Sequence, residues 1–274
     1  MNKINEFTDE LLNGKGYIMI PSVFSSQEIK EANDLINFYI ENEDQKTTHF
    51  QGGNKDKLHL QKRVWNLLNK GDIFVKMVQN RKILEIVGNF LGSEFCLGSI
   101  AANCILPGGP GQEPHVDYPY WDIYKKKSFP LNINPSYPLN CQVTILLTDF
   151  TEENGATGVL PFTQKLCRYP NEEDVLKYFD QGERMTGKAG DIVIFYGLIW
   201  HGAMPNNTID QIRSAILLQY LPKFVKPMED QMRGVNNEVI ESATPILKQL
   251  LGFDYPYPKI LDADEAYNAE GREK

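Results

Sequence analysis

The spacing of apolar residues changes character along the chain. After the short apolar run "YIMI", which predicts a strand, apolar side chains recur at intervals of three and four. They are Ile29, Ala32, Leu35, Ile36, Tyr39 and Ile40. This spacing predicts an amphipathic helix that packs one face. Ser25 with Glu28 three residues later is a capping-box pattern, so the helix is predicted to begin there.

A second helix is predicted from Ile73 to a terminating Gly92, a suitable C-cap residue. The polar, glycine-bearing stretch 48–62 between the two helices predicts a loop, in which His49 and His59 would be solvated.

From residue 95 the chain turns to short β-rich runs separated by Gly, Pro and Asn. In the run 141–147, Val143, Ile145 and Leu147 alternate with Gln142, Thr144 and Leu146, so one strand face is apolar and the other carries polar groups. We therefore expect a mainly β fold with flanking helices, a sandwich or a barrel. A single domain is the simplest organisation, with helical support over about 1–94, a β core over about 95–225 and a Pro- and charge-rich extension over about 226–274.

Charge and cysteine usage narrow the function classes. The net charge of -8 and the pI near 5.1 disfavour nucleic acid and anionic membranes as partners. The apolar runs are shorter than the roughly 20 residues of a membrane helix. The start of the chain has no apolar leader pattern, and the cysteines form no Cys-x-x-Cys pair, which together predict a cytoplasmic protein with reduced thiols. The oligomeric state stays open.

Two histidines and an aspartate suggest a metal site. On a strand, His115 and Asp117 would project to the same side, and His201 follows a later apolar run. Two imidazoles and one carboxylate are the ligand set that holds non-haem Fe(II) and leaves positions open for chemistry. Arg213 lies twelve residues beyond His201, and a strand running back beside the previous one would bring it to the same cavity to clamp a carboxylate.

Other polar and aromatic residues have two readings each. Asn103, Gln142 and Thr144 either face the cavity as cofactor contacts or make cross-strand hydrogen bonds. Tyr118, Tyr120 and Trp121 either line the substrate entrance or pack beneath the loop.

The turn-rich segment 123–140 is predicted to be an active-site lid. Lys125, Lys126 and Lys127 within it would form a solvated face or meet an anionic substrate. Cys104 and Cys141 lie in apolar strands, where thiols are usually inert.

Several segments, in order along the chain, resemble the phytanoyl-CoA hydroxylase-like branch of the Fe(II)- and 2-oxoglutarate-dependent dioxygenases. They are "GYIMIPSVFSSQEI", "ILEIVGNFLG", "PGGPGQEPHVD", "LLTDFTEENGATGVLPFTQK", "KAGDIVIFYGLIWHGAMPNNT" and "RSAILLQYLP". The resemblance implies a double-stranded β-helix, a distorted, cupin-like jelly roll. It also implies His115, Asp117 and His201 as Fe(II) ligands and Arg213 as the partner of the distal carboxylate of 2-oxoglutarate. With O2 as co-substrate, such an enzyme hydroxylates an unactivated C–H bond and releases succinate and CO2.

Asp117 bears on the type of reaction, because related halogenases have Ala or Gly there to admit chloride; hydroxylation is therefore favoured. Desaturation or oxidative cyclisation at the same iron is an alternative, and a non-catalytic β-barrel binding or sensing module is an alternative of another class. The sequence departs from the family where "VLPFTQK" replaces Pro-Gly-Ser-His and where Gly158 stands at a position usually longer or basic. Both departures concern the substrate more than the iron.

Overall fold

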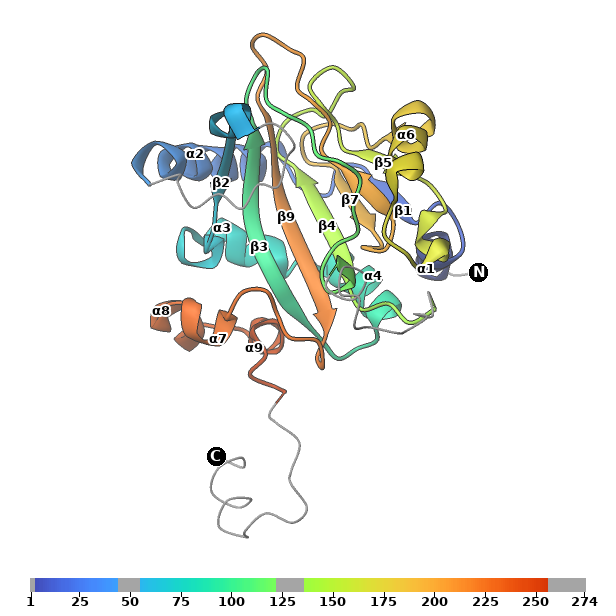
Figure 1. Ribbon diagram of the computed structural model, residues 1–274. Coiled ribbons are helices and arrows are strands. Elements are labelled where there is room, and N and C mark those ends of the chain that lie inside the picture. The colour runs from blue at the N-terminus through green and yellow to red at the C-terminus, as the bar shows by residue number, and fades with distance from the viewer. Residues whose placement is uncertain (1–2, 44–54, 122–135, 256–274) are drawn as a thin grey trace.

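The computed structural model describes residues 3–43, 55–121 and 136–255 (Figure 1). The helices are α1 (Lys3–Leu12), α2 (Ser26–Asn42), α3 (Asp72–Val78), α4 (Arg81–Leu91), α6 (Glu172–Gln181), α7 (Gln231–Gly234), α8 (Asn237–Glu241) and α9 (Pro245–Leu251), with the 3-10 helices η2 (Lys55–Leu60), η3 (Leu67–Asn69) and η4 (Thr163–Leu166). The strands are β1 (Tyr17–Ile20), β2 (Gln61–Val64), β3 (Phe95–Ile105), β4 (Cys141–Leu146), β5 (Gly158–Leu160), β6 (Glu183–Arg184), β7 (Ile192–Phe195), β8 (Trp200–Gly202) and β9 (Arg213–Pro222).

The strands form two antiparallel sheets. The large sheet has the order β1-β7-β4-β9-β3-β2, and Figure 1 shows these strands side by side from β2 on the left to β1 on the right. The small sheet has the order β6-β5-β8. The expected β fold with flanking helices is confirmed. The large sheet remains open, because among the described residues β1 and β2 stand at its edges without pairing to each other.

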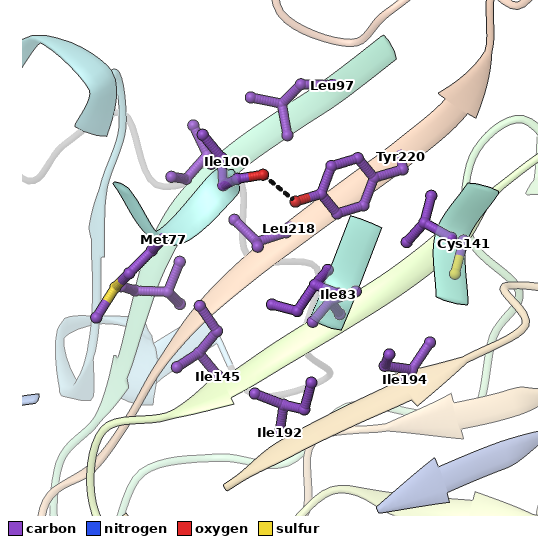
Figure 2. Close-up of a cluster of buried hydrophobic side chains, with 14 of the residues drawn as sticks. Met77, Ile83, Leu97, Ile100, Cys141, Ile145, Ile192, Ile194, Leu218 and Tyr220 are labelled. Carbon is purple, nitrogen blue, oxygen red and sulfur yellow. Dashed lines mark hydrogen bonds between the residues drawn. The ribbon is translucent and has the colours of Figure 1, made fainter. Parts of the chain in front are cut away.

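The two faces of the large sheet differ as the alternation in β4 predicts. One face carries Val143 and Ile145 into a core shared with the helices, and Figure 2 shows Met77 of α3 and Ile83 of α4 meeting Ile145 and Leu218 there. Tyr220 belongs to the same cluster, and its hydroxyl donates to the carbonyl oxygen of Val78 at 2.9 Å, which ties β9 to the end of α3. The opposite face of the sheet is therefore free to line a cavity.

The start of α2 follows the predicted capping box. Ser25 Oγ accepts from the backbone N–H of Glu28, and the Glu28 carboxylate accepts from the backbone N–H of Ser25. Ile29, Ala32 and Ile36 are buried, so the predicted apolar face is the packed one. Both orphan donors at the helix start are thus satisfied locally.

The single helix predicted from Ile73 to Gly92 is wrong in its interior. The chain forms α3 and α4 with a break at Asn80, whose side chain accepts from the backbone N–H groups of Lys82 and Ile83. A cap inside a periodic apolar pattern starts a new helix without disturbing the pattern. The predicted end at Gly92 is confirmed, with φ of 91°.

The predicted loop over 48–62 is wrong in its second half. Residues 55–60 form η2, and residues from Gln61 onward form the edge strand β2, paired with β3. The later part of the predicted lid, 136–140, lies in turns and extended chain before β4. Its earlier part, with Lys125, Lys126 and Lys127, lies outside the described residues, as does the chain after residue 255.

Gly158, the departure noted in the sequence, has a steric cause. A Cβ at this position would collide with the hydroxyl of Tyr178, a buried side chain of α6. That hydroxyl donates to the backbone carbonyl of Gly202 at 3.1 Å, next to His201. Of the helices within the described ranges, none combines the length and the apolar character needed to cross a bilayer.

Candidate metal centre and cofactor cavity

A cavity of about 620 Å³ lies on the polar face of the large sheet and extends to the small sheet. Alternate residues of the large sheet line it: Ser99, Ala101 and Asn103 of β3, Gln142 and Thr144 of β4, and Arg213, Ala215, Leu217 and Gln219 of β9. Apolar residues between them, such as Ile100, Ile145 and Leu218, belong to the hydrophobic core, and Val143 of that core also borders the cavity. The period of two along three neighbouring strands therefore builds the cavity wall.

His115, Asp117 and His201 meet in this cavity. One side-chain ligand atom from each residue lies within 4.8 Å of the others. His201 Nε2 is 3.2 Å from Asp117 Oδ2, and His115 Nε2 is 3.7 Å from Asp117 Oδ1. The predicted convergence of these three side chains is what the structure shows, although His115 lies outside the named strands, in an extended segment.

The two histidines are joined through their main chains. The backbone N–H of His115 donates to the carbonyl of His201 at 3.0 Å, and the N–H of His201 donates to the carbonyl of His115 at 3.2 Å. These two bonds form an isolated β-bridge between the extended segment and β8. The ring centroids lie 4.6 Å apart.

Both imidazoles are held in the tautomer that a metal needs. His115 Nδ1 lies 3.0 Å from the carbonyl oxygen of Glu113, and His201 Nδ1 lies 2.9 Å from that of Ile199. Since a carbonyl only accepts, Nδ1 carries a hydrogen in each ring, and Nε2 is the nitrogen that faces Asp117 and would bind a metal after losing its proton. Main-chain partners of this kind fix ring orientation in metal sites.

The charges within the cluster act on one another. Burial opposes ionisation of Asp117, but His201 first, then His115 and Arg63, hold the pKa of this carboxyl below its usual range. Burial likewise opposes protonation of His201, yet the adjacent Asp117 carboxylate raises the pKa of the ring. A carboxylate and two imidazoles with a shared focus are donors suited to Fe(II), which would displace any proton on Nε2, so the residues present fit this metal.

Arg213 is buried in the same cavity. Its Nη1 donates to the carbonyl of Gly155 at 2.7 Å, and its guanidinium lies over the Phe150 ring at 5.0 Å from the centroid. Its buried Nε has no hydrogen-bond partner, and within the described ranges no carboxylate forms an ion pair with it. Burial lowers the pKa of Arg213 to about 10. An unpaired buried cation with an unused donor fits the carboxylate of a keto-acid.

The path by which Arg213 reaches the cavity differs from the prediction. Strand β9 does not pair with β8, which belongs to the small sheet; it lies between β3 and β4 in the large one. The guanidinium therefore enters the cavity from the opposite wall to His201.

A second cavity arginine was missed. Arg63 on β2 stands opposite Asn103 in register and is partly buried, and desolvation lowers its pKa to about 10 against the raising effect of Asp117. The assignment of this stretch to a loop hid it. The sequence does contain one signal, Trp65 two residues after Arg63. In the structure the centroid of the Trp65 ring lies 5.7 Å from the Arg63 guanidinium.

Three further polar residues were predicted either to face the cavity or to make cross-strand hydrogen bonds. Asn103, Gln142 and Thr144 all line the cavity, and Asn103 Oδ1 also accepts a cross-strand hydrogen bond from Gln61 Nε2 at 2.7 Å. Their contact with a cofactor stays a prediction.

The three aromatic residues after Asp117 divide between the cavity and the core. Tyr118 and Trp121 line the cavity with ring centroids 6.0 Å apart. Tyr120 does not line it: the side chain is fully buried, and its hydroxyl accepts from the backbone N–H of Leu139 at 2.6 Å. The structure thus places Tyr120 in the core, which was the alternative reading.

The cysteines lie as the sequence predicts for inert thiols. Cys104 and Cys141 are buried, and burial raises the pKa of both. No cysteine is paired in a disulfide.

Two histidines and one carboxylate that converge in one cavity match the ligand set of the non-haem Fe(II) oxygenases. The family comparison agrees: the chain belongs to the phytanoyl-CoA dioxygenase (PhyH) family, whose model matches residues 12–215.

Curated fungal proteins are similar to the chain. It is 29% identical over 199 residues to "Dioxygenase cdmD" of Talaromyces verruculosus, a match that covers 70% of this chain and 61% of the relative. It is 26% identical over 255 residues to "Dioxygenase af480" of Aspergillus fumigatus, covering 89% and 75%. It is 27% identical over 201 residues to "Fe(II)/2-oxoglutarate-dependent dioxygenase nvfF" of Aspergillus novofumigatus, covering 70% and 61%. The chain thus spans from about three fifths to three quarters of the length of these relatives.

Solved structures share the fold at low sequence identity. The epimerase SnoN, in complex with Fe3+, alpha ketoglutarate and nogalamycin RO, matches with a TM-score of 0.62 and 14% identity, covering 82% of this chain and 87% of SnoN. HygX from Streptomyces hygroscopicus, with nickel, 2-oxoglutarate and hygromycin B bound, matches with a TM-score of 0.60 and 15% identity, covering 83% and 89%. These matches support the cupin-like jelly-roll fold implied by the sequence.

Proposed function

We propose that the protein is a non-haem Fe(II)- and 2-oxoglutarate-dependent oxygenase that hydroxylates an unactivated C–H bond of a small molecule, with succinate and CO2 as co-products. One observation carries the proposal: His115, Asp117 and His201 direct their ligand atoms to one point in a cavity that also contains Arg213, a buried cation lacking a carboxylate partner in the described chain. Membership of the family and the named activity of the relatives support it.

The roles of the residues follow from their positions. His115, Asp117 and His201 would hold the metal and leave its remaining positions to the co-substrates. Arg213 would bind the distal carboxylate of 2-oxoglutarate and so orient the keto-acid. When bound, Fe(II) and 2-oxoglutarate supply O2 activation and the oxidising power for C–H cleavage. The chain positions the reacting C–H and excludes water.

The outer part of the cavity indicates the chemistry of the substrate. Trp65, Tyr118, Trp121, Tyr169 and Met228 contribute to its lining, so it offers ring faces and a thioether. The cations lining the cavity within the described ranges are Arg213, which is buried, and Arg63, which is partly buried.

Glu113, an exposed carboxylate, stands in the lining as well. An uncharged, largely apolar molecule suits this surface, whereas the phosphates of a coenzyme A ester would find no cation in the described lining besides Arg63 and Arg213.

Desaturation and oxidative cyclisation at the same metal are rival outcomes, and a structural neighbour named an epimerase adds a third. All begin by removing hydrogen from carbon, so product analysis separates them. A cytoplasmic location with reduced thiols stays a prediction alongside this proposal, consistent with four free cysteines.

The direct test is succinate formation by the purified protein with Fe(II), ascorbate, O2 and 2-oxoglutarate over a panel of neutral aromatic and alicyclic compounds, with matched carboxylates and coenzyme A esters. We expect turnover of neutral compounds, and 18O from O2 in a hydroxylated product. Asp117→Gly should abolish hydroxylation, while Arg168→Gln, a change at an exposed arginine paired with Asp174, should not. Absence of both metal binding and succinate from the wild-type protein would leave a non-catalytic module as the function.

A further inference from the structure

The backbone segments that carry Asp117 and His201 are connected by a third side chain. Asn140, fully buried just before β4, donates from Nδ2 to the carbonyl of Tyr118 at 2.6 Å. Its Oδ1 accepts from the backbone N–H of Gly197 at 2.9 Å. Tyr118 directly follows Asp117, and Gly197 begins the turn that leads into β8 and His201.

The connection is closed by the main chain. The backbone N–H of Asp117 donates to the carbonyl of Gly197 at 2.8 Å, so both polar backbone groups of Gly197 are used, one by Asn140 and one by the metal-ligand segment. A Cβ at Gly197 would collide with Asn140 Nδ2, which explains why glycine stands there. Asn140 lies opposite Gly197 when the register that pairs Gln142 with Phe195 is extended two positions beyond the end of the ladder.

The turn that Asn140 holds also orients the second histidine. Within it, Ile199 N–H donates to the carbonyl of Tyr196 at 2.9 Å, and the Ile199 carbonyl accepts from His201 Nδ1 at 2.9 Å. Moving Gly197 would therefore move the acceptor that fixes the tautomer and direction of the His201 ring. The Asn140 amide thus holds the segment of Asp117 through its bond to Tyr118 and the segment of His201 through its bond to Gly197.

We propose that Asn140 is a positioning residue for the metal centre, fixing the distance between Asp117 and His201 through its bonds to Tyr118 and Gly197. This inference rests on the proposed function. Asn140 touches neither metal nor substrate; it acts through the two backbone segments. Outer partners of metal ligands typically contribute 10- to 100-fold in metal affinity, and we expect an effect of about that size here.

The experiment substitutes Asn140→Leu, which removes both hydrogen bonds at similar volume and adds no charge. The carbonyl of Tyr118 keeps a second donor, Gln219 Nε2 at 3.1 Å, so the segment retains a partner. Ni(II) affinity is measured by calorimetry on the full chain, with the visible spectrum of bound Co(II) as a reporter of coordination geometry and the thermal midpoint of the metal-free protein as a reporter of folding.

A matched control is Asn206→Leu. Asn206 is also buried and bridges backbone groups, donating to the carbonyls of Ile105 and Gln211 and accepting from the N–H of Thr208, but it holds no segment next to Asp117. Asn140→Leu should weaken Ni(II) binding about 10- to 100-fold and alter the Co(II) spectrum. Asn206→Leu should lower the thermal midpoint and leave both metal readouts at wild-type values.

Two results would overturn the inference: wild-type Ni(II) affinity in Asn140→Leu, or equal loss of affinity in both variants, which would mark a general effect of stability. If Asn140→Leu does not fold, Asn140→Ser is measured in its place with the same criteria. Failure of the wild-type protein to bind metal would remove the proposed function itself, and the inference with it.

Discussion

Replacing Arg213 with glutamine should weaken the binding of 2-oxoglutarate and leave the stability of the ligand-free protein nearly unchanged. The guanidinium donates to the Gly155 carbonyl and retains an unused Nε, so a keto-acid carboxylate would gain two charge-assisted hydrogen bonds. At about 1.5 kcal/mol or more each, their loss amounts to about 3 kcal/mol. The dissociation constant of 2-oxoglutarate should therefore rise at least about 100-fold.

Folding of the ligand-free protein should respond differently. Burial lowers the pKa of Arg213 from 12.5 to about 10, so at about 1.36 kcal/mol per pKa unit the buried charge costs roughly 3 kcal/mol. Loss of the bond to Gly155 costs about 1.5 to 3 kcal/mol in the other direction. The two terms largely cancel, and the ligand-free variant should unfold close to the wild-type temperature.

The assay is thermal unfolding with Ni(II) present and 2-oxoglutarate added at 100 times its wild-type dissociation constant. Wild type should gain about 2.7 kcal/mol, and the variant, now near its own dissociation constant, about 0.4 kcal/mol. Arg213→Lys keeps the charge without the fork and should lie between them. If Arg213→Gln retains the full ligand-induced stabilisation, Arg213 does not bind the keto-acid.

Three further predictions concern other residues. His115→Ala should lose Ni(II) binding while the protein stays folded, measured by calorimetry and circular dichroism; retained affinity would exclude His115 as a ligand. Tyr120→Phe leaves the Leu139 N–H unpaired and should lower the free energy of unfolding by about 1 to 3 kcal/mol at unchanged kcat/KM. Trp121→Ala should instead raise KM for the substrate. The reverse pattern would exchange the roles of the two residues. Burial raises the pKa of Glu229 to about 7 from 4.5, so its carboxyl destabilises the fold as pH rises through this window. Glu229→Gln should add about 3 kcal/mol at pH 8 and little at pH 4.5 in urea titrations, and equal gains at both pH values would contradict this.

The sequence predicts those features that depend on short-range periodicity. The alternation in β4 gives the correct division between the core face, with Val143 and Ile145, and the cavity face, with Gln142 and Thr144. Arg213 reaches the cavity for the same reason, because its side of β9 is fixed by the period of two. Which strand lies beside β9 depends on pairing between distant segments, and the local pattern contains no information about it.

The missed elements are those without a strong apolar pattern. Strand β2 buries Gln61 and Val64 and turns Arg63 to the cavity, so it lacks the apolar alternation of a strand that packs a core. Helix α6 was also missed, because Tyr178 is its one buried residue, while Leu176 and Phe179 are exposed.

The errors and omissions around the metal centre come from loop geometry. Tyr120 and Trp121 are adjacent in sequence, yet one lies in the core and the other in the cavity. Asn140 carries no motif at all, since its role comes from a register contact with Gly197.

The paired main-chain bonds between His115 and His201 have a consequence for how this centre tolerates change. Hydrogen bonds between backbone groups do not depend on side-chain identity, so the two ligand positions stay adjacent whichever residues occupy them. A metal would therefore enter a frame that is already assembled and leave it without a folding step. By the same logic, descendants of this chain could exchange or discard a ligand, and with it the chemistry, while inheriting the architecture intact.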